Sequence, residues 1–537
     1  MPLLNRREFL SLAPCALQRP TQSKPNFLII LADDMGYSDA GCYGGDIDTP
    51  NIDRLAAQGL RFTQGYSTAR CGPSRSCILT GQYAQQTACD IMTPGVVPDW
   101  TRFAPQHLKP LGYRAYHSGK WHIRFQPLAA AGFDHSYTLL DQDQFFAPRN
   151  SQLDGQSLPP GKLTDNYYAT TAIGSHAIRF LEGHAKEHPA DPFFLYLPFT
   201  APHFPLHALQ QDIDKYQDRF SEGWDRVRAQ RYARMRKMGL VNGPLAPFEP
   251  GIWPDWNLPS EELTARIGPG EVTRAVPWTS LTPVQKTFQR TKMAIHAAMI
   301  DRMDQEIGRV VTQLKAMNAF DNTVIVFVSD NGASAEQLIR GDGHDPQAAP
   351  GSARSHLCLG PGWSTAANTP FRLHKSWVHE GGISSPWIMH WPRGITGHGQ
   401  LRHTPCHLVD LLPTMLDLAG GDARGSLVPN APALAGRSLA PALKRDVRIE
   451  REYLYFHHNK NRALRVGDLK LVAIGEKGPW ALYDLAKDRG EQNDLALKEP
   501  GRVRQMAERW KQVDDDLVKT RETATPTAMP RILQGKK

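Results

Sequence analysis

The stretch Cys71-Gly72-Pro73-Ser74-Arg75 places a reactive side chain at the predicted start of a helix. Pro73 suits the first helical turn, where its missing N–H costs nothing. A cysteine at this position lies in the positive field of the helix N-terminus, which favours an anion, and Arg75 adds a fixed positive charge. An isolated match of this kind would describe an ordinary helix start with a buried thiol. Its chemical meaning therefore depends on polar residues elsewhere in the chain.

Polar side chains follow the predicted buried strands. Continuous apolar runs at 26–32, 192–199 and 323–329 are typical of strands buried on both faces, and a further strand is predicted over 113–117. In open α/β sheets, ligands bind beyond the carboxyl ends of the strands, so polar residues at these ends should converge. The residues at or shortly after these ends are Asp33, Asp34, Lys120, His122, His203, Asp330 and Asn331.

Four of these residues, Asp33, Asp34, Asp330 and Asn331, offer only oxygen ligands to a cation. Adjacent carboxylates at the end of a buried strand are costly unless a cation or hydrogen bonds compensate them. Hard oxygen ligands without clustered histidines favour one divalent cation, Ca2+ or alternatively Mg2+, over zinc. The alternative is that Asp33 caps a helix and Asp34 forms part of a turn.

The cysteine stretch resembles the C-x-P-S-R signature of type I sulfatases, which belong to the alkaline phosphatase superfamily. Five further segments agree with that family in order, namely ILADDMGY, GKWH, APHFP, VSDNG and the K-x-x-x-x-E-G-G around Lys375. The resemblance covers roughly residues 25 to 420. It implies that a formylglycine-generating enzyme converts Cys71 to formylglycine, whose hydrated aldehyde attacks the sulfur of a sulfate ester.

The resemblance also implies one divalent ion, usually calcium, that polarises the sulfate and lowers the pKa of the hydrated aldehyde. Asp330 could in addition accept the proton of the nucleophile. The implied ligands are Asp33, Asp34, Asp330, Asn331 and the modified Cys71.

The remaining matching residues receive roles in charge stabilisation and proton transfer. Arg75 would steady the hydrated aldehyde, while Lys120 and Lys375 would hold the sulfate oxygens. His203, together with Lys375, would protonate the departing alcohol. His122 would take a proton as the aldehyde is restored.

Two further features stay open. Glu380 matches the family, but Glu380-Gly381-Gly382 is interpreted as a segment that shapes a turn. Trp253, Trp256 and Trp278 lie in an irregular region at 205–280, where they could stack on a sugar or an aryl group or simply pack a long loop onto the body.

Helices predicted over 166–181 and 283–317 alternate with the strands, which predicts a large, mostly parallel sheet sandwiched by helices, as in alkaline-phosphatase-like sulfatases. Short alternating runs between 453 and 485, followed by a helix over 500–518, predict a smaller C-terminal part with an antiparallel sheet. The predicted domains are an export signal and linker at 1–24, a catalytic domain at 25–444 and an α+β subdomain at 445–537.

The composition is that of an ordinary globular protein of 537 residues, with 41% hydrophobic and 22% charged residues. The net charge of +8 favours acidic partners, including sulfated polymers. Zinc-finger and RNP signatures are absent from the sequence, so nucleic acid is not an expected partner. No later apolar run reaches the ~18 residues that a transmembrane helix needs.

The N-terminal segment Asn5-Arg6-Arg7-Glu8-Phe9-Leu10 resembles a twin-arginine export signal with a short apolar region. It predicts export to the periplasm or the extracellular space. The alternative is a merely basic terminus.

The leading hypothesis is a formylglycine-dependent sulfatase acting on sulfated carbohydrates or aryl sulfates. Phosphodiesterases and phosphonate monoester hydrolases of the same superfamily are the alternative enzymes, and a non-catalytic binder of sulfated polysaccharides is a third reading. The sequence leaves open the sugar, the position of the sulfate, endo or exo action, disulfide pairing and the oligomeric state.

Overall fold

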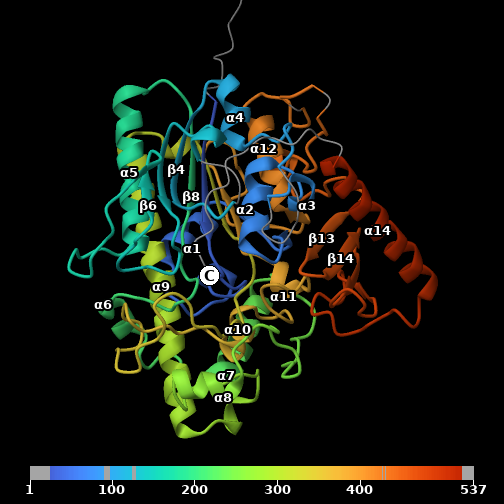
Figure 1. Ribbon diagram of the computed structural model, residues 1–537. Coiled ribbons are helices and arrows are strands. Elements are labelled where there is room, and N and C mark those ends of the chain that lie inside the picture. The colour runs from blue at the N-terminus through green and yellow to red at the C-terminus, as the bar shows by residue number, and fades with distance from the viewer. Residues whose placement is uncertain (1–23, 90–96, 124–127, 426, 430, 523–537) are drawn as a thin grey trace, which may run out of the picture.

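The computed structural model describes residues 24–89, 97–123, 128–425, 427–429 and 431–522. A ten-stranded sheet crosses the main body in the order β11-β2-β10-β9-β1-β8-β4-β5-β6-β7, and a four-stranded sheet lies toward the C-terminal end of the chain (Figure 1). This arrangement confirms the predicted α/β class with a smaller antiparallel sheet. The predicted export signal lies outside the described residues.

Five neighbouring strands at the centre of the large sheet run parallel to one another. Their side chains are almost all buried, as the continuous apolar runs predict. In sheet order these strands are β9 (Thr323–Ser329), β1 (Asn26–Ala32), β8 (Phe193–Pro198), β4 (Arg114–Lys120) and β5 (His135–Leu139).

The outer strands of the large sheet are shorter and mostly antiparallel. β10 (Trp387–His390) pairs antiparallel with both β9 and β2, and β6 pairs antiparallel with β5 and β7. The other outer strands are β2 (Leu60–Phe62), β11 (Leu401–Arg402), β6 (Ser151–Leu153) and β7 (Gln156–Ser157), and a separate pair is formed by β3 (Gly65–Tyr66) and β12 (Cys406–His407).

Helices cover both faces of the large sheet (Figure 1). Along β1 the side chains alternate, so that Leu28 and Ile30 pack into one hydrophobic core while Phe27 and Ile29 pack into another. The first core includes α1 (Pro50–Ala57), α5 (Ala169–Glu187) and α9 (Pro283–Ala316), and the second includes α2 (Cys71–Thr80), α4 (Ala104–Leu108) and α12 (Leu411–Leu418).

The remaining helices connect the strands. They are α3 (Ala84–Thr87), α6 (Gln210–Ile213), α7 (Gly223–Lys237), α8 (Ser260–Arg266), α10 (Pro361–Ala367), α11 (Glu380–Ile383) and α13 (Ala440–Lys444). Of these, α7, α8 and α10 lie together at the lower end of the body (Figure 1). Short 3-10 turns are η1 (Gly41–Tyr43), η2 (Lys109–Leu111), η3 (Leu128–Ala131), η4 (Asp214–Tyr216), η5 (Trp278–Ser280), η6 (Phe320–Asn322) and η7 (Leu408–Asp410).

The small sheet is a fully antiparallel meander that packs on two sides. It consists of β13 (Leu454–His458), β14 (Asn461–Val466), β15 (Leu469–Ala473) and β16 (Ala481–Asp484). One face packs on the main body, where Phe456 contacts Tyr66, and the other is covered by α14 (Pro500–Glu522) through Met506. Among the described residues, no helix combines the length and apolar character needed to cross a bilayer.

Two predicted helix starts are shifted for local reasons. The helix expected from residue 166 begins at Ala169, because Asn166 has a left-handed backbone with φ of 50°. The amphipathic pattern of residues 407–419 predicts a second helix, but α12 begins only at Leu411, because the ring of His407 accepts a hydrogen bond from Val409 N and starts a 3-10 turn instead.

Candidate active site

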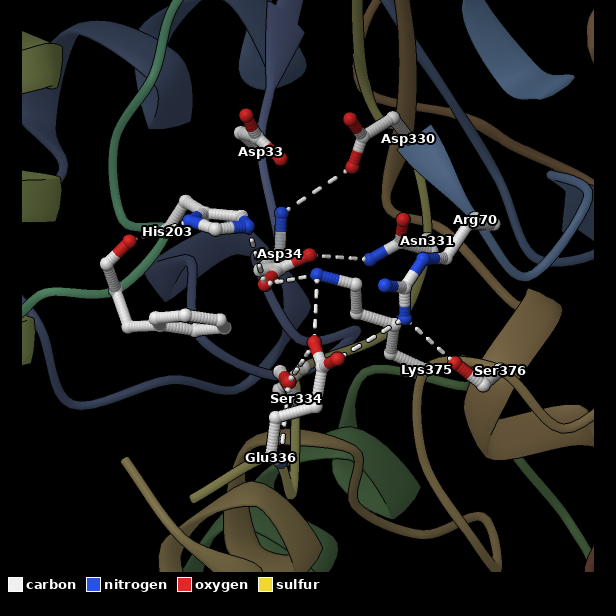
Figure 2. Close-up of polar contacts among 12 residues, drawn as sticks. Asp33, Asp34, Arg70, His203, Asp330, Asn331, Ser334, Glu336, Lys375 and Ser376 are labelled. Carbon is white, nitrogen blue, oxygen red and sulfur yellow. Dashed lines mark hydrogen bonds and ion pairs between the residues drawn. The ribbon is translucent and has the colours of Figure 1, made fainter. Parts of the chain in front are cut away.

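Residues of the predicted site lie at the carboxyl ends of adjacent parallel strands. Asp33 follows β1, Asp330 follows β9, and His203 lies shortly after β8. Because β9, β1, β8 and β4 are neighbours in the sheet, their ends meet at one edge, and the polar side chains there face one another (Figure 2).

Lys120 reaches this edge because β4 continues through Gly119, whereas the sequence predicted a strand ending at His117. Gly119 has a φ of 135°, and a Cβ atom there would lie 2.0 Å from the carbonyl oxygen of Pro198 on β8. Only glycine allows so close an approach of the two backbones. Lys120 Nζ consequently donates to Asp33 Oδ2 at 2.5 Å.

The carboxylate of Asp33 is fully buried and is paired with two cations, Lys120 and Arg75. Burial alone would raise the pKa of Asp33, but the charges of Lys120 and Arg75 hold that pKa below its usual value. Its second oxygen, Oδ1, accepts no hydrogen bond from the described residues.

Asp34 joins the site through a left-handed backbone, with φ of 68°. Asn331 Nδ2 donates to Asp34 Oδ1 at 2.7 Å, and Lys375 Nζ donates to Oδ2 at 2.8 Å (Figure 2). The backbone N–H of Asp34 donates to Asp330 Oδ1 at 3.2 Å. Burial raises the pKa of Asp34 above its usual value despite the nearby ammonium of Lys375.

Asp330 shares the guanidinium of Arg75 with Asp33. Arg75 Nη2 lies 3.0 Å from Asp330 Oδ2 and 3.3 Å from Asp33 Oδ2, and all three side chains are buried. Burial, together with the charge of Asp33, raises the pKa of Asp330 to about 7. A carboxyl group with that pKa can take up or release a proton near neutral pH.

Cys71 is the first residue of α2, and it is 1% exposed. The start of α2 is fixed by Ser74, whose hydroxyl donates to the carbonyl oxygen of Asp330 at 2.5 Å, and by Arg75, whose Nη1 donates to that of Lys120 at 2.9 Å. Burial raises the pKa of the Cys71 thiol to about 11. The thiol is therefore protonated at neutral pH and, without modification, is a weak nucleophile.

Two histidines complete the set of sequence-predicted residues. His203 Nδ1 donates to the carbonyl oxygen of Phe204 at 2.5 Å, so the Nε2 atom faces the site, 3.8 Å from Asp34 Oδ2. His122 has a left-handed φ of 52°, and its Nδ1 is buried without a partner among the described residues. Burial and the neighbouring lysines lower the pKa of His203, and burial, Lys120 and Arg75 lower the pKa of His122.

The oxygen donors of the site fit a hard cation. One potential ligand atom from each of Asp33, Asp34, Cys71 and His203 lies within 4.8 Å of the others. Asn331 Oδ1, like Asp33 Oδ1, is a buried oxygen that accepts no hydrogen bond from the described residues. Buried oxygens of this kind are satisfied when they coordinate a metal ion such as Ca2+ or Mg2+.

The sequence did not identify Glu336 and Arg70 as site residues. Glu336 Oε2 lies 3.1 Å from Lys375 Nζ, and Glu336 Oε1 accepts from Arg70 Nη1 at 3.2 Å (Figure 2). The position of Arg70 directly before Cys71 is a sequence feature that could have identified this arginine as a site residue. A single glutamate in the loop after Gly332 carries no periodic signal that would have singled it out.

Glu380 lies outside this group of residues. It begins the four-residue helix α11, so this segment does form a short helical turn. In addition, the carboxylate of Glu380 forms ion pairs. Its carboxylate lies 3.0 Å from Lys470 Nζ on β15 and 2.7 Å from Arg489 Nη2, which ties α11 to the C-terminal part of the chain.

The small sheet also touches the loop next to Lys375. Asn461 Nδ2, at the start of β14, donates to the carbonyl oxygen of Ser376 at 2.7 Å. Ser376 Oγ in turn accepts from Arg70 Nη1 at 2.8 Å. Asn461 of β14 therefore supports the loop at Ser376, which in turn contacts Arg70.

A family model described as Sulfatase matches residues 25–421, which is most of the chain. The chain belongs to the sulfatase family. A second model, described as N-sulphoglucosamine sulphohydrolase, C-terminal, matches residues 371–522 of this sulfatase. Members of the family are sulfuric ester hydrolases, and this sulfatase is therefore an enzyme of that class.

Three similar proteins show how much of the sulfatase is shared. An uncharacterized sulfatase of Schizosaccharomyces pombe is 30% identical, covering 94% of this chain and 95% of the relative. An arylsulfatase of Klebsiella aerogenes is also 30% identical, covering 80% and 95%. The crystal structure of Ps i-CgsB in complex with k-i-k-neocarrahexaose is 23% identical, covers 94% and 96%, and has a TM-score of 0.65, so it shares the fold.

Proposed function

We propose that this sulfatase hydrolyses sulfate esters of carbohydrates or aryl alcohols through a formylglycine formed from Cys71. The observation that supports the proposal is the buried group of Asp33, Asp34, Cys71 and His203, whose potential ligand atoms lie within 4.8 Å of one another. The protonated state of the thiol also favours a modified nucleophile, because a buried, neutral thiol would attack a sulfate ester poorly.

The proposed metal ligands are Asp33, Asp34, Asp330, Asn331 and the modified residue 71. A divalent cation, Ca2+ in first place, would supply positive charge to the sulfate oxygens and to the nucleophile when bound. The alternative cation is Mg2+, which demands a tighter octahedral shell than Ca2+.

The lysine and arginine side chains around this group would bind the sulfate and position the nucleophile. Lys120 and Lys375 lie within hydrogen-bond distance of Asp33 and Asp34, so a sulfate entering the site can take hydrogen bonds from both ammonium groups. Arg75 donates a hydrogen bond to the carbonyl oxygen of Lys120 and so fixes the N-terminal end of α2, which carries the nucleophile.

Proton transfer would fall to the two histidines. Burial, followed by the charges of Lys375 and Lys120, lowers the pKa of His203. An anionic sulfate bound beside these lysines would offset their charges and so shift His203 toward its protonated, acidic form. His203 would then give this proton to the leaving alcohol, and His122 would accept the proton released when the aldehyde is restored.

Maturation and export are part of the same proposal. A formylglycine-generating enzyme would modify Cys71, and the N-terminal Arg6-Arg7 segment would direct the folded protein to the periplasm or beyond. Cell fractionation tests the export step. A full-length protein that stays in the cytoplasm with residues 1 to 20 intact would contradict it.

Mass spectrometry of the peptide containing residue 71 tests the nucleophile. We expect a residue that has lost sulfur and two hydrogens and gained one oxygen. The Cys71→Ala variant should release no sulfate yet still bind substrate. Cys77→Ala, six residues further along the same helix, serves as a control with retained turnover. Paired assays on a sulfate monoester and a phosphate diester decide between the two enzyme classes, and preference for the diester would contradict the proposal.

A further inference from the structure

Trp256 is connected to the sulfate-binding end of the site through one carboxylate. Its indole Nε1 donates to Glu336 Oε1 at 2.8 Å, and the other oxygen of Glu336 lies 3.1 Å from Lys375 Nζ. Trp256 comes from the segment between α7 and α8, far in sequence from both partners. The tryptophan is therefore held at a fixed place relative to the lysine that would grip the sulfate.

Exposure rises along this connection. The side chains of Lys375 and Glu336 are each 1% exposed, that of Arg70 is 18% exposed, and Trp256 is 37% exposed. The connection therefore leads from the buried cation group to the surface. A sulfate ester must place its sulfate at the buried end, so its organic part lies on the outer side, where Trp256 is exposed.

The rings of Trp253 and Trp278, the other two tryptophans considered in the sequence, already pack against other side chains. Trp278 is buried and packs edge-on against Trp224 and Trp363. Trp253 is also 37% exposed, but the guanidinium of Arg274 lies 3.3 Å from its ring centroid and covers the ring. Over the ring of Trp256, the part of the chain that the structure describes places only the more distant guanidinium of Arg70, at 5.9 Å.

We propose that Trp256 is the binding surface for the ring of the substrate that carries the scissile sulfate. This inference rests on the proposed function and specifies its substrate as a sulfate ester of a ring-shaped alcohol, whose flat face stacks on the indole. A pyranose and an aryl ring share this chemistry, because both present C–H or π surface to an aromatic side chain. Trp256 contributes to binding the ring, and Glu336 fixes its orientation.

Two substitutions separate stacking from the hydrogen bond to Glu336. Trp256→Phe keeps an aromatic face but loses the Nε1–H donor, whereas Trp256→Gln keeps a side-chain N–H but loses the ring. Stacking predicts that KM for a ring substrate rises about tenfold in Trp256→Gln and less than about threefold in Trp256→Phe. Trp253→Gln, with equal exposure in the same region, should leave KM unchanged.

The substrates for this test are N-acetylglucosamine 6-sulfate and 4-nitrophenyl sulfate. Inorganic sulfate serves as an inhibitor, because it has no ring and its inhibition constant measures binding at the buried lysines alone. The inhibition constant for sulfate should be the same in wild type and in both Trp256 variants. A rise in KM for one substrate only identifies that ring class, and a rise for both supports the shared chemistry. Thermal unfolding confirms that each variant is folded.

Equal KM values in wild type and Trp256→Gln would overturn the inference, as would a loss in Trp256→Phe as large as that in Trp256→Gln. A changed inhibition constant for sulfate would also overturn it, because the tryptophan would then act through Glu336. These outcomes differ from failure of the proposed function, in which the wild-type enzyme itself releases no sulfate.

Discussion

Glu336 Oε2 lies 3.1 Å from Lys375 Nζ, with both side chains 1% exposed. Lys375 also lies 2.8 Å from Asp34 Oδ2, so its ammonium sits between two buried carboxylates. Because a buried charge must be compensated, these two carboxylates together hold the lysine at the edge of the cation group.

Removal of one of these carboxylates should impair the enzyme. In Glu336→Gln the ammonium of Lys375 keeps its ion pair with Asp34 and is drawn toward that carboxylate, away from an incoming sulfate. We expect kcat/KM to fall about ten- to a hundredfold, as for other residues that orient a metal site. Steady-state kinetics measure the effect, and Glu476→Gln, at an exposed pair with Lys460, is the control. Unchanged kcat/KM would show that Glu336 does not position Lys375.

Cation removal should reduce both stability and activity. Dialysis against a chelator leaves the buried oxygens of Asp33 and Asn331 without a partner, so the folded state loses the free energy of cation binding. We expect a lower Tm and loss of turnover, both restored by Ca2+ more effectively than by Mg2+. Differential scanning calorimetry with each ion checks this expectation, and a Tm insensitive to added Ca2+ would argue against a cation site.

The buried ion pairs of Lys470, on β15 of the small sheet, should contribute strongly to stability. Lys470 is fully buried, 3.0 Å from Glu380 and 2.8 Å from Glu491. Lys470→Met would leave two buried carboxylates facing each other, at an expected cost of about 3–5 kcal/mol in the free energy of unfolding. Urea unfolding measures it.

The matched control for this prediction is Lys487→Met. Lys487 also pairs with a carboxylate, that of Asp484 at 3.0 Å, but its side chain is 84% exposed. Exposed pairs contribute little, so the free energy of unfolding should change by less than about 1 kcal/mol. Equal losses in both variants would refute the stabilising role of the buried group.

Acid should destabilise the fold through His117. This histidine is buried among the rings of Trp121, Phe133 and Tyr196, and burial lowers its pKa to about 3. The unfolded chain binds a proton at this residue below about pH 6.5, but the folded chain does not until about pH 3. Folding stability is therefore lost as the pH falls, by about 2 kcal/mol between pH 7 and pH 5.

Urea unfolding at several pH values tests this dependence. His117→Gln removes the titrating group, so its free energy of unfolding should decline less steeply between pH 7 and pH 5 than that of the wild type. The comparison concerns the slope, which is independent of any constant cost of the substitution. Parallel pH dependences in the two proteins would exclude His117 as a source of the acid sensitivity.

The central strands and the residues at their ends were predictable from the sequence, because strands buried on both faces leave continuous apolar runs such as 26–32. Other features depend on packing between distant segments. The predicted strand ended at His117, before Gly119, but the close approach of Gly119 to Pro198 makes this glycine part of β4. Glu336 enters the site along an irregular loop, and the antiparallel direction of β10 is set by its neighbours β9 and β2.

The hydrogen bond from Asn461 to Ser376 has a practical consequence for protein engineering. A fragment cut after residue 444 would retain every residue proposed for the chemistry, yet it would lose the amide that supports the loop beside Lys375 and the lysine that neutralises Glu380. Such a minimal catalytic fragment should be insoluble or inactive. Fusion partners and tags are better attached beyond α14 than inserted between the two sheets.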